Sequence, residues 1–376
     1  MKLLTFILAF FVIFVPMSGE VSALQLHRVE AGETLFEISN QYDVNSEELS
    51  ELNLLKDVNL VYDGQALLIP KEGEDTHVVS EGDTLNNIAS HYGFSIEELT
   101  EINDIEDSDV IYIDQEITLP RIVTMPPHIS ASSSGTSNSL ETVETNEIKD
   151  TKVVNDEADI EDNVISTTQG LLSLYPDNFY QRGSTGEKKV ALTFDDGPDS
   201  KYTPQILEIL DEYDVPATFY YVGQNIESYP DVLKDTVDRG HEVGNHSWSH
   251  PNLRYLPEDE FEKEIDKTSD IIKEYTGEEA ATLRPPYGDL DIDNMPYLVE
   301  ENYNVVNWSI DTWDWWNMDS DKILINVLKD LHPDSIILLH SAGSSEGYQS
   351  TVDALPEIIY NLKVRGYDFV TVSEII

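Results

Sequence analysis

The sequence predicts an α/β protein: a distorted (β/α) barrel preceded by two small βααβ modules. Two observations lead to this prediction. The first 120 residues match themselves at an offset of 50 residues, and from about Leu171 onward candidate strands alternate with candidate helices. A fixed period indicates duplicated modules, and strands that alternate with helices favour a parallel sheet. A chain of 376 residues has room for both.

The N-terminus has the pattern of an export signal. Lys2 precedes the 13-residue apolar run Leu3–Val15, which is short for a membrane span, and residues 21–23 offer a cleavage site. We therefore expect a signal peptide over residues 1–23, a secreted protein, and no stable membrane span after cleavage. The alternative is an uncleaved membrane anchor, which would also leave the rest of the chain outside the cytoplasm.

Two repeats are expected at residues 26–70 and 76–120, each with the order strand, helix, helix, strand. The matching pairs are Val29 and Val79, Gly32 and Gly82, Thr34-Leu35 and Thr84-Leu85, Asn53 and Asn103, Tyr62 and Tyr112, and Gln65 and Gln115. Thr34 and Thr84 are the expected caps of the first helix of each repeat. Ser46 and Ser95 are the expected caps of the second helix.

These repeats resemble LysM domains in their G-[ED]-T-L start and in the N…Y..Q pattern that ends at a proline. The resemblance implies binding to polymers that contain N-acetylglucosamine, chiefly peptidoglycan and chitin. The alternative is a module that keeps the fold but no longer binds sugar.

Residues 121–170 differ in composition from both flanking regions. They contain no Phe, Trp or Tyr, a Ser/Thr/Asn-rich stretch over 130–139, and nine acidic residues against three basic ones. Such a segment buries too little apolar surface to fold, and its charges repel one another. We expect a disordered, acidic tether.

Residues 171–376 are expected to form the barrel. The candidate strands are Lys189–Phe194, Ala217–Val222, His241–Gly244, Thr282–Arg284, Asn304–Ile310, Ser335–Leu339 and Asp368–Val372. The candidate helices between them include Pro204–Tyr213, Glu258–Tyr275 and Val352–Val364. In barrels of this type the chemistry lies at the carboxyl ends of the strands.

Charged and histidine side chains recur at those strand ends. Asp195-Asp196 follows the first strand, and His246 and His250 follow the third at i and i+4. On one helical turn both rings would lie on the same face and share a metal ion. One aspartate with two histidines leaves open positions on the ion, as a catalytic site needs. The second carboxylate of the pair is then free to act as a base.

Five ordered motifs in residues 185–376 resemble the NodB-type polysaccharide deacetylases, carbohydrate esterase family 4. They are Thr193–Pro198, His246–His250, Arg284–Tyr287, Asp311–Trp315 and Leu338–His340. The resemblance implies that Asp195 is the general base. It also implies that Asp196, His246 and His250 bind one divalent metal ion. Zinc is the first choice for such ligands, although cobalt, manganese or iron could occupy the same site.

The same resemblance implies roles for four further residues. Arg284 would hold and tune the general base, and the backbone N–H of Tyr287 would stabilise the oxyanion. His340 would be the general acid that protonates the leaving amine, with Asp314 orienting its ring.

Trp315 is expected to line the substrate site, because aromatic faces stack on sugar rings. Trp313 and Trp316 either share that role or pack beneath the loop. Two residues depart from the family pattern, since Thr312 stands where serine is frequent and Ser341 where aspartate is common. Neither change removes a group that the implied reaction needs.

The favoured function is metal-dependent hydrolysis of N-acetyl groups from N-acetylglucosamine in peptidoglycan, with the repeats holding the enzyme at the cell wall. Chitooligosaccharides and N-acetylmuramic acid are alternative substrates, and an inactive wall-binding protein is an alternative of another class.

A net charge of −51 argues against nucleic acid as a partner. The absence of cysteine excludes thiol chemistry. A glycosidase is disfavoured because adjacent aspartates do not flank a bond at the ~5–9 Å separation that it requires.

Overall fold

The computed structural model describes residues 23–57, 60–71, 76–79, 83–92, 96–103, 105, 107–108, 110–113, 115–119, 168–316, 318–343 and 347–376. The expected signal peptide, apart from Ala23, and residues 121–167 of the expected tether lie outside these ranges. Among the described residues, no helix has both the length and the apolar character needed to cross a membrane.

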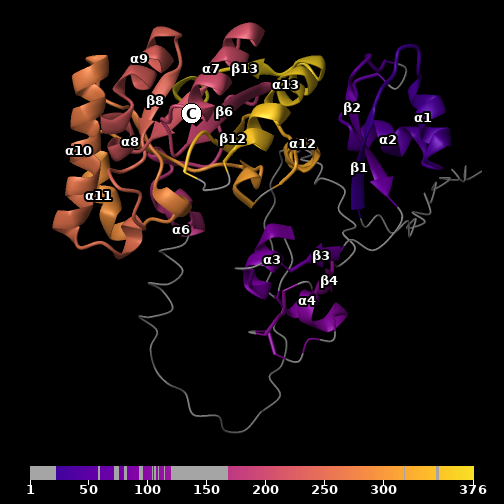
Figure 1. Ribbon diagram of the computed structural model, residues 1–376, viewed down its shortest axis with the longest axis horizontal. Helices are drawn as coiled ribbons and strands as arrows, with labels where there is room; N and C mark the ends of the chain where they lie inside the picture. Colours follow the sequence, from indigo (N-terminus) through magenta and orange to yellow (C-terminus); the bar gives the residue numbers. More distant parts are fainter. Residues whose placement is uncertain are drawn as a thin grey trace, which may run out of the picture. The chain divides into compact units, whose positions relative to one another are not determined.

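The first repeat has the expected order of elements. They are β1 (Ala23–Arg28), α1 (Leu35–Gln41), α2 (Ser46–Leu52) and β2 (Ala66–Lys71), with β1 paired to β2 (Figure 1). Thr34 caps α1 in a reciprocal capping box with Glu37, as predicted. The predicted cap of α2 is one residue off: the Asn45 side chain accepts the first free N–H groups, and Ser46 is already helical.

The second repeat has the same plan, with β3 (Thr76–Val78), α3 (Leu85–Tyr92), α4 (Ile96–Ile102) and β4 (Glu116–Thr118). Its two strands pair antiparallel, with His77 opposite Ile117. The Thr84 hydroxyl accepts the N–H of Asn87 in the first turn of α3, as predicted. Ser95 lies outside the described residues.

One repeated asparagine explains much of the sequence period. The Asn53 side chain donates to Leu49 O and Leu68 O and accepts from Leu68 N, over 2.6–2.9 Å. Asn103 makes the same three bonds in the second repeat, to Leu99 and Thr118. An amide that offers two donors and one acceptor therefore ties the second helix to the last strand in both modules.

The C-terminal domain contains a parallel sheet. The described residues of this domain, which are 168–376 without 317 and 344–346, form nine strands of it. They are β5 (Phe179–Tyr180), β6 (Lys189–Asp195), β7 (Thr218–Tyr221), β8 (Glu242–Asn245), β9 (Thr282–Leu283), β10 (Asn304–Val306), β11 (Ile310–Asp311), β12 (Ser335–His340) and β13 (Asp368–Phe369). The order is β11-β12-β6-β7-β8-β9-β10-β5, and β13 also pairs with β6.

The strand order shows that the sheet curls into a distorted barrel, as predicted. β10 and β11 stand near opposite ends of the order, yet only residues 307–309 separate them in the chain. Because a residue spans at most about 3.5 Å, the two edges must approach each other. The predicted strand Asn304–Ile310 is therefore two strands, since the chain leaves one edge at Val306 and joins the other at Ile310.

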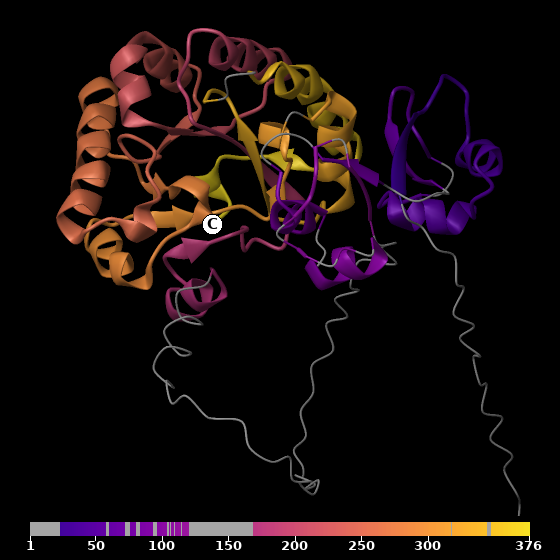
Figure 2. The ribbon, with the colours of Figure 1, turned by 60° about the horizontal axis from the view of Figure 1, so that its bottom comes forward.

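Helices form an outer layer around these strands (Figure 2). They are α6 (Thr168–Leu174), α7 (Tyr202–Tyr213), α8 (Gly223–Ser228), α9 (Pro230–Asp238), α10 (Glu258–Thr276), α11 (Met295–Glu300), α12 (Ser320–Lys329) and α13 (Gln349–Val364). Short 3₁₀ turns lie at Leu253–Tyr255, Pro286–Gly288, Ile292–Asn294, Asp314–Trp316 and Val372–Glu374. Every residue of β6 after Lys189 is buried, which is typical of a strand covered on both faces.

Candidate active site

The predicted site residues follow the carboxyl ends of neighbouring strands. Asp195 ends β6, His340 ends β12, and these two residues are direct partners in the parallel pairing of the strands. His246 follows β8, and Arg284 follows β9. Residues far apart in the chain thus lie at one edge of the barrel. This is the edge, at the carboxyl ends of the strands, where the sequence predicts the chemistry.

Asp196, His246 and His250 form a compact cluster with ligand atoms within 4.8 Å of one another. Asp196 Oδ1 lies 3.4 Å from His246 Nε2 and 3.1 Å from His250 Nε2. The two rings are 5.0 Å apart between centroids. Within the described chain this group has the residue types and spacing of a site for one divalent metal ion.

Hydrogen bonding supports the assignment of a cation to this cluster. His246 Nδ1 lies 2.7 Å from the carbonyl oxygen of Arg284, which only accepts, so Nδ1 carries the proton. Nε2 then faces Asp196 Oδ1, a buried oxygen that has no hydrogen-bond partner in the described structure. Positive charge is needed between these two atoms, and either a proton on Nε2 or a metal ion would supply it.

Burial works against ionisation of Asp196, but close polar contacts with His246 and His250 and the positive charge of His340 and His246, when these rings are protonated, lower the pKa of its carboxyl below the usual range. The ligand is therefore held in its charged form, the form that binds a metal ion.

The expected helical turn between His246 and His250 is absent. Residues 246–250 form a bent loop, in which Ser247 has φ 63° and His250 has φ 58°. Ser247 Oγ accepts the N–H of His250, and Ser249 is tied to Glu264 on α10. The rings converge by this loop geometry, because Pro251 disfavours helical backbone at His250.

Arg284 is fully buried and holds Asp195 in place. Its Nη1 donates to Asp195 Oδ1 at 2.8 Å and to Thr193 Oγ1 at 2.7 Å. Nε and Nη2 donate to the carbonyl oxygens of Val306 and Asn307, where the chain passes from β10 towards β11. With Oδ1 occupied, Asp195 Oδ2 remains open on the side of His246, 3.8 Å from its Nε2.

His340 and Asp314 form a hydrogen-bonded pair. His340 Nδ1 lies 2.8 Å from Asp314 Oδ1, and the backbone N–H of His340 donates to Asp314 Oδ2 at 2.8 Å. Burial disfavours the imidazolium, but Asp314, with smaller contributions from Asp196 and Asp195, raises the pKa of His340 to about 9. The ring is therefore protonated near neutral pH and can donate from Nε2.

Several loops of this edge have an unusual backbone conformation. Asp196, Tyr287 and Trp313 have φ of 69°, 63° and 58°, values that are uncommon for residues other than glycine. Such conformations cost on the order of 1–3 kcal/mol each and persist where the surroundings enforce them. These conformations occur in the motif loops. There the fold accepts a less stable backbone in order to place the side chains at the site.

The tryptophans beside the site contact one another. Trp315 lies 4.8 Å from Trp313 and 5.1 Å from Trp316 between ring centroids. Trp315 is 41% exposed, as a surface for a sugar ring would be, whereas the other two are half-buried. Tyr287, at 66% exposed, is a second accessible aromatic side chain next to the metal cluster, with its ring 4.9 Å from that of His250.

Sequence patterns did not reveal the hydrogen bonds that support the site residues. Thr351 donates its hydroxyl to Asp314 Oδ2 at 2.8 Å. Ser341, one of the departures, donates its N–H and its hydroxyl to the carbonyl oxygen of Asp195. Thr312, the other departure, donates to Leu338 O at 2.7 Å. No motif marks Thr351, since it belongs to α13 and reaches the site only through the fold.

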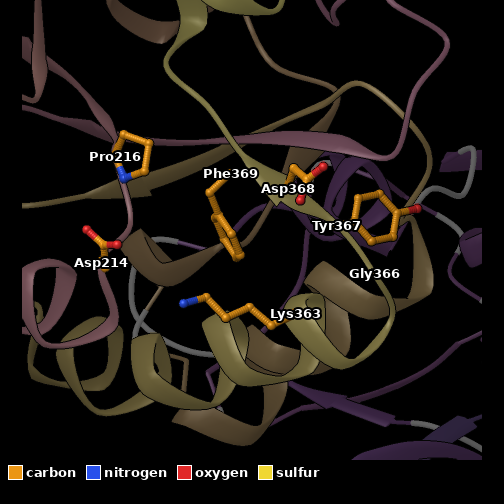
Figure 3. A pocket seen from close by; sticks show the side chains of 7 residues that line it. All are labelled: Asp214, Pro216, Lys363, Gly366, Tyr367, Asp368 and Phe369. Atoms are coloured by element: carbon orange, nitrogen blue, oxygen red, sulfur yellow. The ribbon is translucent and has the colours of Figure 1, made fainter.

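A hollow of about 370 Å³ lies at the other end of the strands (Figure 3). It is lined by Asp214, Pro216, Lys363, Gly366, Tyr367, Asp368 and Phe369. These residues belong to segments that lead into β7 and β13, so the hollow is at the amino ends of the strands. Barrel enzymes place their chemistry at the carboxyl ends, so the hollow is not the candidate active site.

Comparison with known proteins agrees with this description. The polysaccharide deacetylase family matches residues 182–306, and the LysM domain matches residues 27–70 and 77–120. A peptidoglycan-N-acetylglucosamine deacetylase of Bacillus cereus is 43% identical over 189 residues, which make up 50% of this chain and 68% of that protein.

Two further comparisons cover the same part of the chain. A peptidoglycan-N-acetylmuramic acid deacetylase of Bacillus subtilis is 38% identical over 189 residues, or 50% of this chain and 39% of that protein. A crystal structure of a peptidoglycan N-acetylglucosamine deacetylase has a TM-score of 0.53 at 40% identity, and covers 54% of this chain and 95% of that chain.

The cluster generates a prediction about metal binding. His250→Ala should weaken binding of a divalent ion by at least about 10–100-fold, because it removes a ligand outright. Calorimetric titration of the metal-free protein with zinc, cobalt and manganese would measure the change. His332→Ala, which alters a histidine outside the cluster, is the matched control. Equal affinity of the His250 variant and the control would contradict the assignment.

Proposed function

The chain belongs to the polysaccharide deacetylases of carbohydrate esterase family 4, and we propose that it removes the acetyl group from N-acetylglucosamine residues of peptidoglycan. One observation carries the proposal. The Asp196, His246 and His250 cluster, a carboxylate held by Arg284 and an imidazole held by Asp314 all lie at or just after the carboxyl ends of the parallel strands. An acid, a base and a metal cluster on one face are the groups that hydrolysis of an amide requires.

The first half of the reaction uses the base. A divalent ion bound by the cluster would supply charge that polarises the acetyl carbonyl. Asp195 Oδ2 takes a proton from water as the water oxygen bonds to the carbonyl carbon. The backbone N–H of Tyr287 is the proposed donor to the resulting oxyanion. Arg284 keeps Asp195 oriented during this step through the bond from Nη1 to Oδ1.

The second half of the reaction uses the acid. The tetrahedral carbon releases nitrogen, and the electron pair of the C–N bond goes to that nitrogen. His340 Nε2 gives its proton to the same nitrogen, so the products are acetate and a glucosamine with a free amine. Asp314 stabilises the protonated ring before the transfer and orients it.

Two alternatives are less well supported by the geometry. A glycosidase needs two carboxylates free to flank one bond, whereas Asp195 is committed to Arg284 and Asp196 to two histidines. An inactive wall-binding protein has no need of a complete set of base, acid and ligands. N-acetylmuramic acid and chitooligosaccharides stay as alternative substrates of the same chemistry.

The LysM repeats support peptidoglycan as the polymer and the cell wall as the place of action. Two binding modules on one chain raise the local concentration of the catalytic domain at the glycan. Secretion, the expected consequence of the export signal, would bring the enzyme to that substrate. Zinc is the metal that we propose, because nitrogen and oxygen ligands with open positions suit it.

The substrate is tested by incubating the full chain with purified peptidoglycan and analysing the digested fragments by tandem mass spectrometry. We expect the mass of one acetyl group to be lost from N-acetylglucosamine. Loss from N-acetylmuramic acid instead would replace the proposed sugar with its alternative. No loss from either sugar, with metal bound and soluble chitooligosaccharides also intact, would refute the deacetylase proposal.

Asp195→Asn should fold and bind metal but lose activity by about 10²–10⁴-fold, because the change removes the base and spares the ligands. Turnover, metal content and melting temperature should be measured on the same preparation. Asp199→Asn, in the loop that follows, is the matched control for loss of one negative charge. Turnover like that of the wild type in Asp195→Asn would require another base.

Asp314→Asn should lower turnover without emptying the metal cluster. The pKa of His340 is raised, so the acid is competent below about pH 9 and activity falls as the pH rises through that value. Removing the carboxylate should move this alkaline limb to lower pH.

His340→Ala should lower turnover more than Asp314→Asn does. The double variant should be little worse than His340→Ala, because the effects of paired catalytic groups are not additive. Additive losses that follow the loss of folded protein would contradict the acid assignment.

A further inference from the structure

The start of α13 lies against the pair formed by His340 and Asp314. Tyr348, the residue that precedes α13, is only 4% exposed. Its ring is nearly parallel to the His340 imidazole, at 10° and 5.4 Å between centroids. Thr351, in the first turn of the same helix, donates its hydroxyl to Asp314 Oδ2 at 2.8 Å. One short segment therefore contacts both members of the pair.

The Tyr348 ring is itself packed against a second tyrosine. Tyr202 of α7 meets it edge to face, at 88° and 6.5 Å between centroids. Gly347 has φ 86°, and a Cβ there would lie 1.9 Å from the Tyr202 hydroxyl oxygen, so only glycine allows this close approach. The Tyr202 hydroxyl accepts from Lys201 Nζ at 2.6 Å. These contacts leave the Tyr348 ring little freedom to turn away from His340.

We propose that Tyr348 is a positioning residue for the general acid, and that its ring fixes the plane of the His340 imidazole while its π face stabilises the protonated form. This inference rests on the proposed function. The bond from Nδ1 to Asp314 limits, from the ring edge, the rotation of the His340 imidazole about its Cβ–Cγ bond. A parallel aromatic ring on one face restricts that rotation and excludes water there. The electron-rich face of a phenol also attracts a cation.

The charged groups around His340 restrain its ring at the edge and not on the face. Asp314 binds the ring edge, while Asp195, Asp196 and Asp311 act on it through charge. Charge stabilises the imidazolium without choosing its plane. The proton on Nε2 must be aimed at the nitrogen of the breaking C–N bond, and that nitrogen leaves as an amine once it has accepted the proton. A contact on the face of the ring adds to the edge bond from Asp314 in aiming this proton, and Tyr348 provides it.

The test compares two substrates whose leaving groups differ. An N-acetyl sugar loses an amine, which needs the proton from His340, whereas 4-nitrophenyl acetate loses a stable phenolate that does not. Both substrates use the metal cluster and Asp195. Tyr348→Leu in the full chain should lower the ratio of amide to ester turnover by roughly three- to thirtyfold, the range expected for loss of a cation–π contact. Tyr348→Phe keeps the ring and should restore the ratio to within about twofold.

Two further variants complete the experiment. Tyr213→Leu, which alters a tyrosine at the amino ends of the strands under Lys363, controls for general loosening and should leave the ratio unchanged. His340→Ala sets the limit, with amide turnover reduced by about 10²–10⁴-fold and ester turnover largely kept. Metal content is measured for every variant, so that loss of the ion is seen directly.

The outcomes separate the two proposals. An unchanged ratio in Tyr348→Leu, with a lowered ratio in His340→Ala, would overturn the role of Tyr348 and leave the proposed function standing. A ratio lowered equally in Tyr213→Leu would also overturn it, because the ratio would then report loosening. Equal losses on both substrates in His340→Ala would remove the general acid itself, and with it any group for Tyr348 to position.

Discussion

The buried guanidinium of Arg284 is the interaction on which the rest of the catalytic domain depends. Breaking a buried ion pair by removal of one partner costs about 3–5 kcal/mol, so Arg284 requires every acceptor that surrounds it. Those acceptors are the carboxylate of Asp195, the hydroxyl of Thr193 and two carbonyl oxygens at the break between β10 and β11. The Tyr220 ring covers the guanidinium at 4.2 Å.

The same residue links the architecture to the chemistry. The carbonyl groups that Arg284 satisfies belong to Val306 and Asn307, at the start of the segment that closes the barrel. Its own carbonyl accepts from Nδ1 of His246, a proposed metal ligand, and so leaves Nε2 as the ring atom that faces Asp196. A single residue, through its side-chain donors and its backbone carbonyl, thereby joins barrel closure, the proposed base and the proposed metal cluster.

The proposed acid and the proposed base each pair with a different residue and not with each other. Asp195 and His340 are neighbours in the strand pairing, and a direct pair between them would leave neither able to do its work. A cation holds Asp195 on one side, and Asp314 holds His340 on the other. Arg284 thus orients the proposed base, and Asp314 stabilises the proposed acid in its protonated form.

The sequence by itself determined the modules, the parallel barrel, and the residue types at the strand ends, because strand and helix periods, repeats and motif spacing are local properties. Only the tertiary structure decided how those residues meet. The bonds of Arg284 to Thr193 and Asp195 span 91 and 89 residues, and no local pattern reports such contacts. The split of the predicted strand at 307–309, the loop that replaces the helical turn before His250, and the contacts of Tyr348 and Thr351 with the acid pair likewise arise from packing between distant segments, where shape and polar partners outweigh local preference.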